Sequence, residues 1–302
     1  MHASILSVTL TILFVAQASA GPYAPPAGQP GSTAISNSSP SIVEWASGFQ
    51  NLIRGPMDIA NPAGGLASFG TGNEALGVAY GNSLHVVSLG DAGQITLSFD
   101  RPIFDGPGAD LAVFENSFSD SFLELAIVEV STNGTDFLRF PAVSLTQTTT
   151  QVGGFGSLDA TNLDNLAGKY RGGFGTPFDL HQLAGLSPSV DVNQIHFVRI
   201  IDVVGSINPS FGTQDSLGNM INDPYPTASA SGGFDLDGVG VINVVPEPAT
   251  LTLLAIGFAL AYGFRRRRRA LTVGALAVSN RARLDLQPGC SKQLSDELSA
   301  GT

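Results

Sequence analysis

Short apolar runs of strand length, broken by Gly, Asn, Asp and Pro, limit how this chain folds more than any other feature. Residues 94–99 alternate between apolar and polar side chains, which is the pattern of a half-buried strand. Asn133-Gly134 lies between two further runs and is a strong signal for a β-hairpin. Helical periodicity is nearly absent, and one short helix is expected within residues 158–170. The pattern predicts an all-β chain with a single jelly-roll-like β-sandwich, in which further strands are expected at 111–114, 123–130 and 197–204.

Acidic side chains dominate the central part of the chain. Between residues 21 and 245, six Lys and Arg face 21 Asp and Glu, which gives a formal charge of −15. This charge repels the phosphates of nucleic acid, so no nucleic-acid partner is expected, and it favours cations. The single cysteine, Cys290, excludes a disulfide scaffold.

The first twenty residues have the features of a signal peptide. Residues 5–16 are apolar, and Ala18 and Ala20 provide the small side chains that signal peptidase requires at its cleavage site. We therefore expect residues 1–20 to be removed; the alternative is a buried strand or helix. Residues 21–40 are rich in Pro, Gly, Ser and Ala, which predicts a flexible leader before an ectodomain at 41–245.

A second apolar segment lies near the other end. Residues 249–264 are uncharged, and as a helix they rise about 24 Å, somewhat less than the bilayer core. Five arginines follow and hold that flank in the cytoplasm, so the segment predicts a transmembrane helix with residues 21–245 outside the inner membrane. A buried helix is the alternative.

The apolar segment belongs to a three-part tail. Pro246, Glu247 and Pro248 precede it, and the basic residues that follow it are Arg265, Arg266, Arg267, Arg268 and Arg269. Together these parts resemble the PEP-CTERM sorting signal of Gram-negative bacteria, here residues 246–269. The resemblance implies recognition by exosortase, transient residence in the inner membrane, removal of the tail, and release to the cell surface or extracellular matrix. The atypical extension at 270–302 departs from the pattern, and if it blocks processing the protein stays a membrane-anchored envelope protein.

The central segment has a resemblance of its own. Residues 105–110, 113–116, 175–179 and 232–237 are similar to blocks found in a group of exported bacterial surface proteins. In their rhythm of strands and loops these proteins look like galactose-binding, discoidin-like jelly rolls. The resemblance implies binding of a ligand or a matrix component, such as an extracellular polysaccharide, without identifying it.

Several carboxylates lie at the ends of expected strands. Asp110 and Glu115 bracket one run, Asp202 shares a strand face with apolar residues, and Asp235 and Asp237 leave the same face of a strand. An isolated carboxylate on an apolar face is costly, and hard oxygen ligands without His or Cys favour calcium. We predict that these five residues supply most of one Ca²⁺ site; the alternative is that they are separate capping carboxylates at turns.

Catalysis has little support in the sequence. No nucleophile elbow, phosphate loop or zinc-protease motif is present, and the histidines of the central segment are isolated. Trp45, Phe49 and Tyr225 are candidates for stacking on a sugar, although each also suits core packing. We therefore expect a non-enzymatic, secreted surface or matrix protein without catalytic residues, which binds calcium and a glycan or matrix component. A glycan-active enzyme that uses a carboxylate pair is the alternative.

Overall fold

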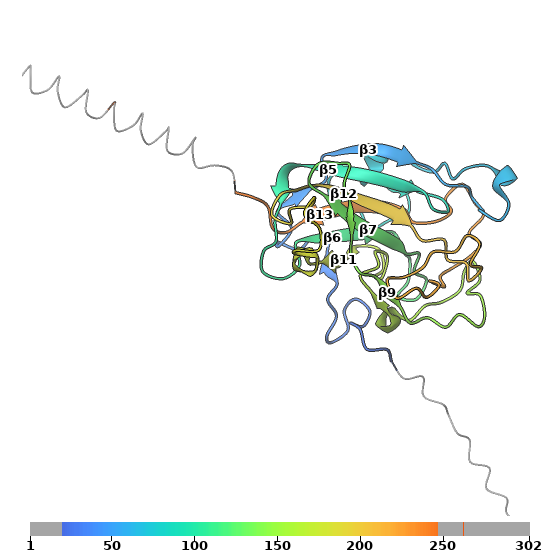
Figure 1. The fold of residues 1–302 in the computed structure, drawn as a ribbon. Helices are drawn as coiled ribbons and strands as arrows, with labels where there is room; N and C mark the ends of the chain where they lie inside the picture. The colour runs from blue at the N-terminus through green and yellow to red at the C-terminus, as the bar shows by residue number, and fades with distance from the viewer. Residues whose placement is uncertain (1–19, 247–261, 263–302) are drawn as a thin grey trace, which may run out of the picture. The chain divides into compact units, whose positions relative to one another are not determined.

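The computed structural model describes residues 20–246 and Tyr262 (Figure 1). Residues 1–19 of the predicted signal peptide lie outside the described residues. So do Glu247 and Pro248 of the sorting motif, residues 249–261 and 263–264 of the predicted membrane span, the five arginines and the extension at 270–302. Among the described residues, no helix has the length and apolar character needed to cross a membrane.

The part of the chain that the structure describes is all-β, as predicted, and its strands pair antiparallel throughout. Four short 3₁₀ turns, η1 to η4, interrupt the loops at Pro62–Gly64, Gly72–Ala75, Ala160–Asn162 and Leu180–Leu183. The strands are β1 Ile35–Ser36, β2 Glu44–Trp45, β3 Gly48–Ile53, β4 Val87–Ser88, β5 Gln94–Ile103, β6 Leu111–Glu115, β7 Ala126–Ser131, β8 Leu138–Arg139, β9 Val143–Ser144, β10 Leu163–Asp164, β11 Phe174–Phe178, β12 Ile195–Asp202 and β13 Asp235–Val241.

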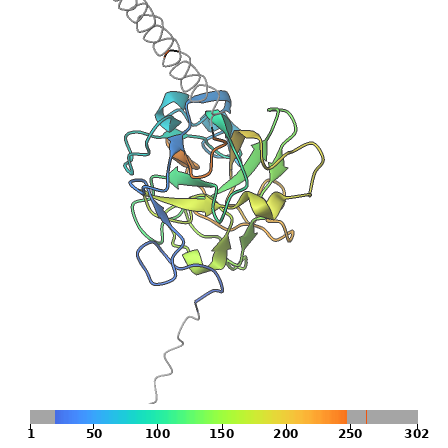
Figure 2. The ribbon, with the colours of Figure 1, turned by 90° about the vertical axis from the view of Figure 1, so that its left-hand side faces the viewer.

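Two larger sheets form the domain. The first has the strand order β1-β11-β6-β13-β2, with β4 also paired to β13, and the second has the order β3-β5-β12-β7-β8. Strands β9 and β10 form a small separate pair. Figures 1 and 2 show these strands surrounded by long loops. The order is compatible with the predicted jelly roll, and the likeness to a discoidin-like fold stays a prediction.

The main hydrophobic core joins the two sheets. Val113 and Val239 enter it from the first sheet, and Leu97, Val128 and Ile200 enter it from the second. Both sheets turn an apolar face toward this core, so the arrangement is that of a β-sandwich. The alternation of side chains along a strand explains how one face reaches the core: in β12, the buried residues Val198, Ile200 and Asp202 alternate with half-buried residues.

Local expectations were met unequally. The alternating residues 94–99 form the first part of β5, and the predicted hairpin joins β7 to β8. Its connection is longer than a two-residue turn, since β7 ends at Ser131 and β8 begins at Leu138. Within it, Asn133 Oδ1 accepts hydrogen bonds from the backbone N–H groups of Thr135 and Asp136. The helix expected within 158–170 is wrong: the 3₁₀ turn η3 is followed by Asn165 at a positive φ of 48°, which ends any helical path.

The predicted leader packs against the domain. The N–H of Gly21 donates to Thr161 Oγ1 at 2.7 Å, and the N–H of Tyr23 donates to the Thr161 carbonyl at 3.0 Å. A Cβ at position 21 would lie 2.2 Å from that carbonyl oxygen, so the contact needs glycine. Strand β1 then adds to the edge of the first sheet through β11. Residues 21–40 are therefore part of the folded domain, since strand pairing and loop contacts override their turn-rich composition.

Candidate functional site

The structure does not bring the five predicted calcium ligands together. Among residues 20–246 and Tyr262, the single group of three acidic, His or Cys side chains with ligand atoms within 4.8 Å of one another is Asp105, Asp110 and Asp179. Only Asp110 belongs to both sets. The prediction of one site built from all five is wrong in its geometry, because most of these carboxylates are engaged by separate backbone N–H groups.

Asp202 and Asp237 each fasten a loop to a strand. Asp202 Oδ2 accepts from the N–H of Ala92 at 2.9 Å, and its Oδ1 accepts from the N–H of Phe234 at 2.6 Å. Asp237 accepts from the N–H groups of Tyr80 and Gly81 at 2.8 and 2.5 Å. These two side chains therefore act as capping carboxylates, which was the alternative reading of the sequence.

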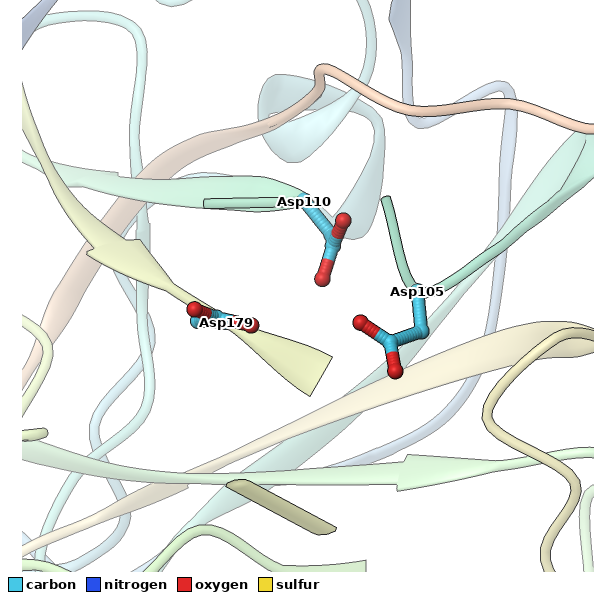
Figure 3. A group of neighbouring side chains, drawn as sticks. All are labelled: Asp105, Asp110 and Asp179. Carbon is cyan, nitrogen blue, oxygen red and sulfur yellow. The ribbon is translucent and has the colours of Figure 1, made fainter. Parts of the chain in front are cut away.

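Asp110 also holds backbone, and two further carboxylates lie beside it. Its oxygens accept from Gly106 N at 2.8 Å, Asn243 Nδ2 at 2.8 Å and Leu180 N at 2.7 Å. Figure 3 shows Asp105 and Asp179 turned toward the same space. With one oxygen each, three carboxylates supply half or less of the six to eight oxygens that calcium takes. Calcium binding by this chain stays a prediction.

A cavity of about 330 Å³ lies where loops 116–124, 153–156 and 226–231 meet the start of β13. Its volume is at the lower end of the range typical of small-ligand sites. We call it the aromatic-rimmed pocket. It is lined by Ser83, Asn116, Phe118, Phe122, Glu124, Gly154, Phe155, Pro226, Thr227, Ala228, Ser229, Ser231 and Asp235.

Three phenylalanines form a ladder along this pocket. The ring centroids of Phe118 and Phe122 are 4.6 Å apart with planes at 16°, and those of Phe122 and Phe155 are 6.0 Å apart with planes at 25°. Phe155 is 90% exposed and Phe118 is 75% exposed. A side chain of this size is normally buried, and neighbouring exposed aromatic rings mark an interaction surface.

The buried wall of the pocket carries carboxylates. Glu124 is 8% exposed, and within the described residues its side chain has no hydrogen-bond or ion-pair partner. Burial, followed by the charges of Glu115 and Asp235, raises the pKa of Glu124 well above its usual value. Glu115 is 1% exposed and does not line the pocket: its Oε2 accepts from Ser117 N at 2.7 Å, and its Oε1 is buried without a partner in the described chain.

Asp235, unlike Glu124, accepts hydrogen bonds from other side chains of the protein. Its Oδ1 accepts from Ser88 Oγ, and its Oδ2 accepts from Asn116 Nδ2 at 3.0 Å. Burial raises the pKa of Asp235 to about 6 against these hydrogen bonds, which lower it. Two carboxyl groups in unlike surroundings thus line one cavity, together with an amide and several hydroxyl groups.

A second cavity, of about 280 Å³, includes the ammonium of Lys169 in its wall. Lys169 Nζ donates to the carbonyl of Leu163 at 2.7 Å and lies over the rings of Tyr23 and Tyr170. Burial lowers the pKa of Lys169 to about 8. Because the protein itself occupies this ammonium, the cavity offers a ligand less than the aromatic-rimmed pocket does.

The aromatic residues singled out in the sequence lie elsewhere. Trp45 packs on Phe114 with ring centroids 5.2 Å apart, and Tyr225 is buried, with its hydroxyl donating to Asp58 Oδ1 at 2.8 Å. Phe49 is 38% exposed on β3 and is not among the residues that line the pocket.

Sequence reasoning missed Glu124 and the three phenylalanines. Residues 116–122 are small polar side chains interrupted by Phe118 and Phe122, and Glu124 lies inside the apolar run that follows them. The available signal was the combination of aromatic residues in a polar loop and, directly after them, a charged residue in a strand-like apolar run. That combination indicates a candidate binding site. Phe155 carried no such signal, because only the fold places its loop next to Phe122.

One family matches this chain. Its description is PEP-CTERM protein-sorting motif, and it covers residues 244–269, which include the predicted motif, apolar segment and arginines. No curated protein matches the chain.

Proposed function

We propose that this chain is an exported surface protein that binds a glycan noncovalently in the aromatic-rimmed pocket. The PEP-CTERM motif at 244–269 supports an exosortase-sorted protein of the cell surface or extracellular space. An ectodomain related to galactose-binding jelly rolls is part of the proposal, and the all-β sandwich is compatible with it.

The exposed phenylalanine ladder is the observation that carries glycan binding. A pyranose ring presents an apolar face of C–H groups, which packs on an aromatic ring, and hydroxyl groups at its edge, which need acceptors. Phe118 and Phe155 offer ring faces at the mouth of the pocket, and Glu124, Asp235 and Asn116 offer acceptor oxygens in its wall. An apolar surface beside a few convergent polar groups is the usual composition of a small-ligand site.

Removing a ring of the ladder is expected to weaken glycan binding. For Phe155→Ala we expect at least a tenfold loss of affinity for glycans that the wild-type ectodomain selects on a glycan array, measured by calorimetry. Because Phe155 is 90% exposed, the substitution leaves the core intact. Leu217→Ala removes another exposed apolar side chain, 68% exposed and outside the pocket lining, and should bind as the wild type does. A Phe155→Ala variant that binds like the control would refute the proposed site.

Processing by signal peptidase at one end and by exosortase at the other is expected to shorten the chain at both ends. The intact mass of protein recovered from the native envelope or medium should lack residues 1–20 and the sorting tail, including the apolar segment 249–264 and everything after it. A chain that still carries Arg265 to Arg269 would instead identify a permanently anchored envelope protein. A mass that includes residues 1–19 on protein found inside the cell would contradict export altogether.

A glycan-active enzyme is the second candidate, because two carboxyl groups with unlike environments line one cavity. Burial and like charges raise the pKa of Glu124 well above its usual value, as a general acid requires. Asp235 accepts hydrogen bonds from Ser88 Oγ and Asn116 Nδ2, which favour its charged form. We propose binding without turnover, and a product assay decides between the two. Release of new reducing ends from a bound glycan, abolished by Glu124→Gln, would favour the enzyme.

A further inference from the structure

We infer that the group bound in the wall of the aromatic-rimmed pocket is an ammonium, so that the glycan is one whose amino sugars carry a free amino group. The inference rests on the proposed function and names its ligand class. It starts from Glu124, a carboxylate that is 8% exposed, lines the cavity and has no partner among the described residues. A buried carboxylate of this kind is unfavourable unless a donor or a cation completes it.

The protein supplies further negative charge around Glu124 and little positive charge. Glu115 from β6 and Asp235 from β13 are the acidic groups that act on it most strongly, followed by Asp223 and by Asp202 from β12. Glu115 does not line the cavity, and its buried Oε1 also has no partner in the described chain, so it does not offset the charge of Glu124. The guanidinium of Arg54, which faces Asp235, is occupied by the carbonyl oxygens of Phe69, Gly70 and Ser88. The negative charge of this wall is therefore not balanced by the protein, and a cationic ligand would balance it.

The spacing of the carboxylates favours an ammonium over a metal ion. A metal draws its ligand oxygens close together, yet Glu115, Glu124 and Asp235 do not form a group with ligand atoms within 4.8 Å in the described chain. An ammonium can pair with the carboxylate of Glu124 alone and donate its other hydrogen bonds to hydroxyl groups or water, so it needs no group of three converging carboxylates. The rings of Phe118 and Phe122 beside the wall also attract a cation through their faces.

An amino sugar satisfies both parts of the pocket at once. Its ring packs on the phenylalanine ladder, and its ammonium reaches the carboxylate of Glu124. N-acetylation removes the charge and enlarges the group, so the acetylated sugar should lose the contact with Glu124 while it keeps the contact with the rings.

The test compares two oligosaccharides of equal length on the exported protein. We expect β-1,4-linked glucosamine oligomers to bind at least tenfold more tightly than their N-acetylated counterparts in calorimetry at pH 7. Glu124→Gln has nearly the same shape as the protonated acid and should fold normally. It should abolish the preference and leave binding of the acetylated oligomer within about twofold. Asp136→Asn removes an exposed carboxylate outside the pocket and should keep the preference.

A proton count provides a second readout. Because burial and neighbouring carboxylates raise the pKa of Glu124, an ammonium that binds there favours the charged form and releases a proton. The binding enthalpy should then depend on the ionisation enthalpy of the buffer for wild type and not for Glu124→Gln. The other titrating groups that face Glu124, namely Glu115, Asp202, Asp223 and Asp235, are unchanged in both proteins.

The outcomes separate this inference from the proposed function. Equal affinity for the two oligomers, or a preference that survives Glu124→Gln, would overturn the ammonium while glycan binding that is lost in Phe155→Ala stands. Binding of spermidine or a lysine-rich peptide with no binding of any glycan would overturn both. Tight binding of the amino sugar that needs both Phe155 and Glu124 supports both.

Discussion

Asp202→Ala is expected to destabilise the folded ectodomain by about 2–4 kcal/mol. The carboxylate is 2% exposed, and its two oxygens accept from the N–H groups of Ala92 and Phe234. Ala92 has a positive φ of 59°, so this hydrogen bond also holds a strained turn before β5. Alanine at position 202 leaves the buried N–H of Phe234 unsatisfied, at about 1–3 kcal/mol, and removes the hydrogen bond to the exposed residue Ala92, at about 0.5–1.5 kcal/mol. Urea denaturation monitored by fluorescence measures the loss as a lower midpoint with an unchanged slope.

The control for Asp202 is a carboxylate without such a role. Asp136 is exposed in the loop between β7 and β8, and Asp136→Ala should stay within about 0.5 kcal/mol of the wild type. An Asp202→Ala protein with wild-type stability would show that the strands hold the two loops without this carboxylate.

The ectodomain is expected to be more stable at pH 5 than at pH 7.5 in the presence of a chelator. Burial raises the pKa of both Asp91 and Asp235 to about 6, and it raises those of Glu115, Asp202 and Asp223 well above their usual values. The folded state therefore binds protons more tightly than the unfolded chain. Stability is lost as the pH rises from about 4, where the unfolded carboxyls titrate, through about 6, where Asp91 and Asp235 titrate in the fold.

The size of this pH effect follows from the same two groups. Between pH 5 and pH 7.5, Asp91 and Asp235 together contribute on the order of 3 kcal/mol, which corresponds to roughly 5–10 °C in melting temperature for a domain of this length. Scanning calorimetry at both pH values measures the difference, and Asp235→Asn should reduce it. A melting temperature that rises with pH over this interval would mean that the buried carboxylates have cationic partners in solution.

The pH effect also bears on the predicted calcium. A cation bound among the carboxylates stabilises their charged forms, so it opposes the loss of stability at neutral pH. The chelator keeps the two contributions apart. Without it, a bound ion would mask the titration of Asp91 and Asp235.

The sequence by itself determined the elements that depend on neighbouring residues. The alternation at 94–99 predicts the first part of β5, and the Asn-Gly pair predicts the connection between β7 and β8. The tail at 246–269 was likewise readable, because a motif, an apolar run and a basic cluster are all local patterns, and the matched family covers them. Local patterns report what a segment does alone.

Only the tertiary structure decided where the carboxylates point and what they meet. Asp202, Asp110 and Asp237 looked equivalent in the sequence, yet each caps a different loop through backbone N–H groups that are distant along the chain. Residues 21–40 looked like a leader, yet they find partners in residues far along the chain. The aromatic-rimmed pocket exists because three loops meet at one end of the first sheet. Chain packing sets such long-range encounters, and no residue type or spacing encodes them within a single segment.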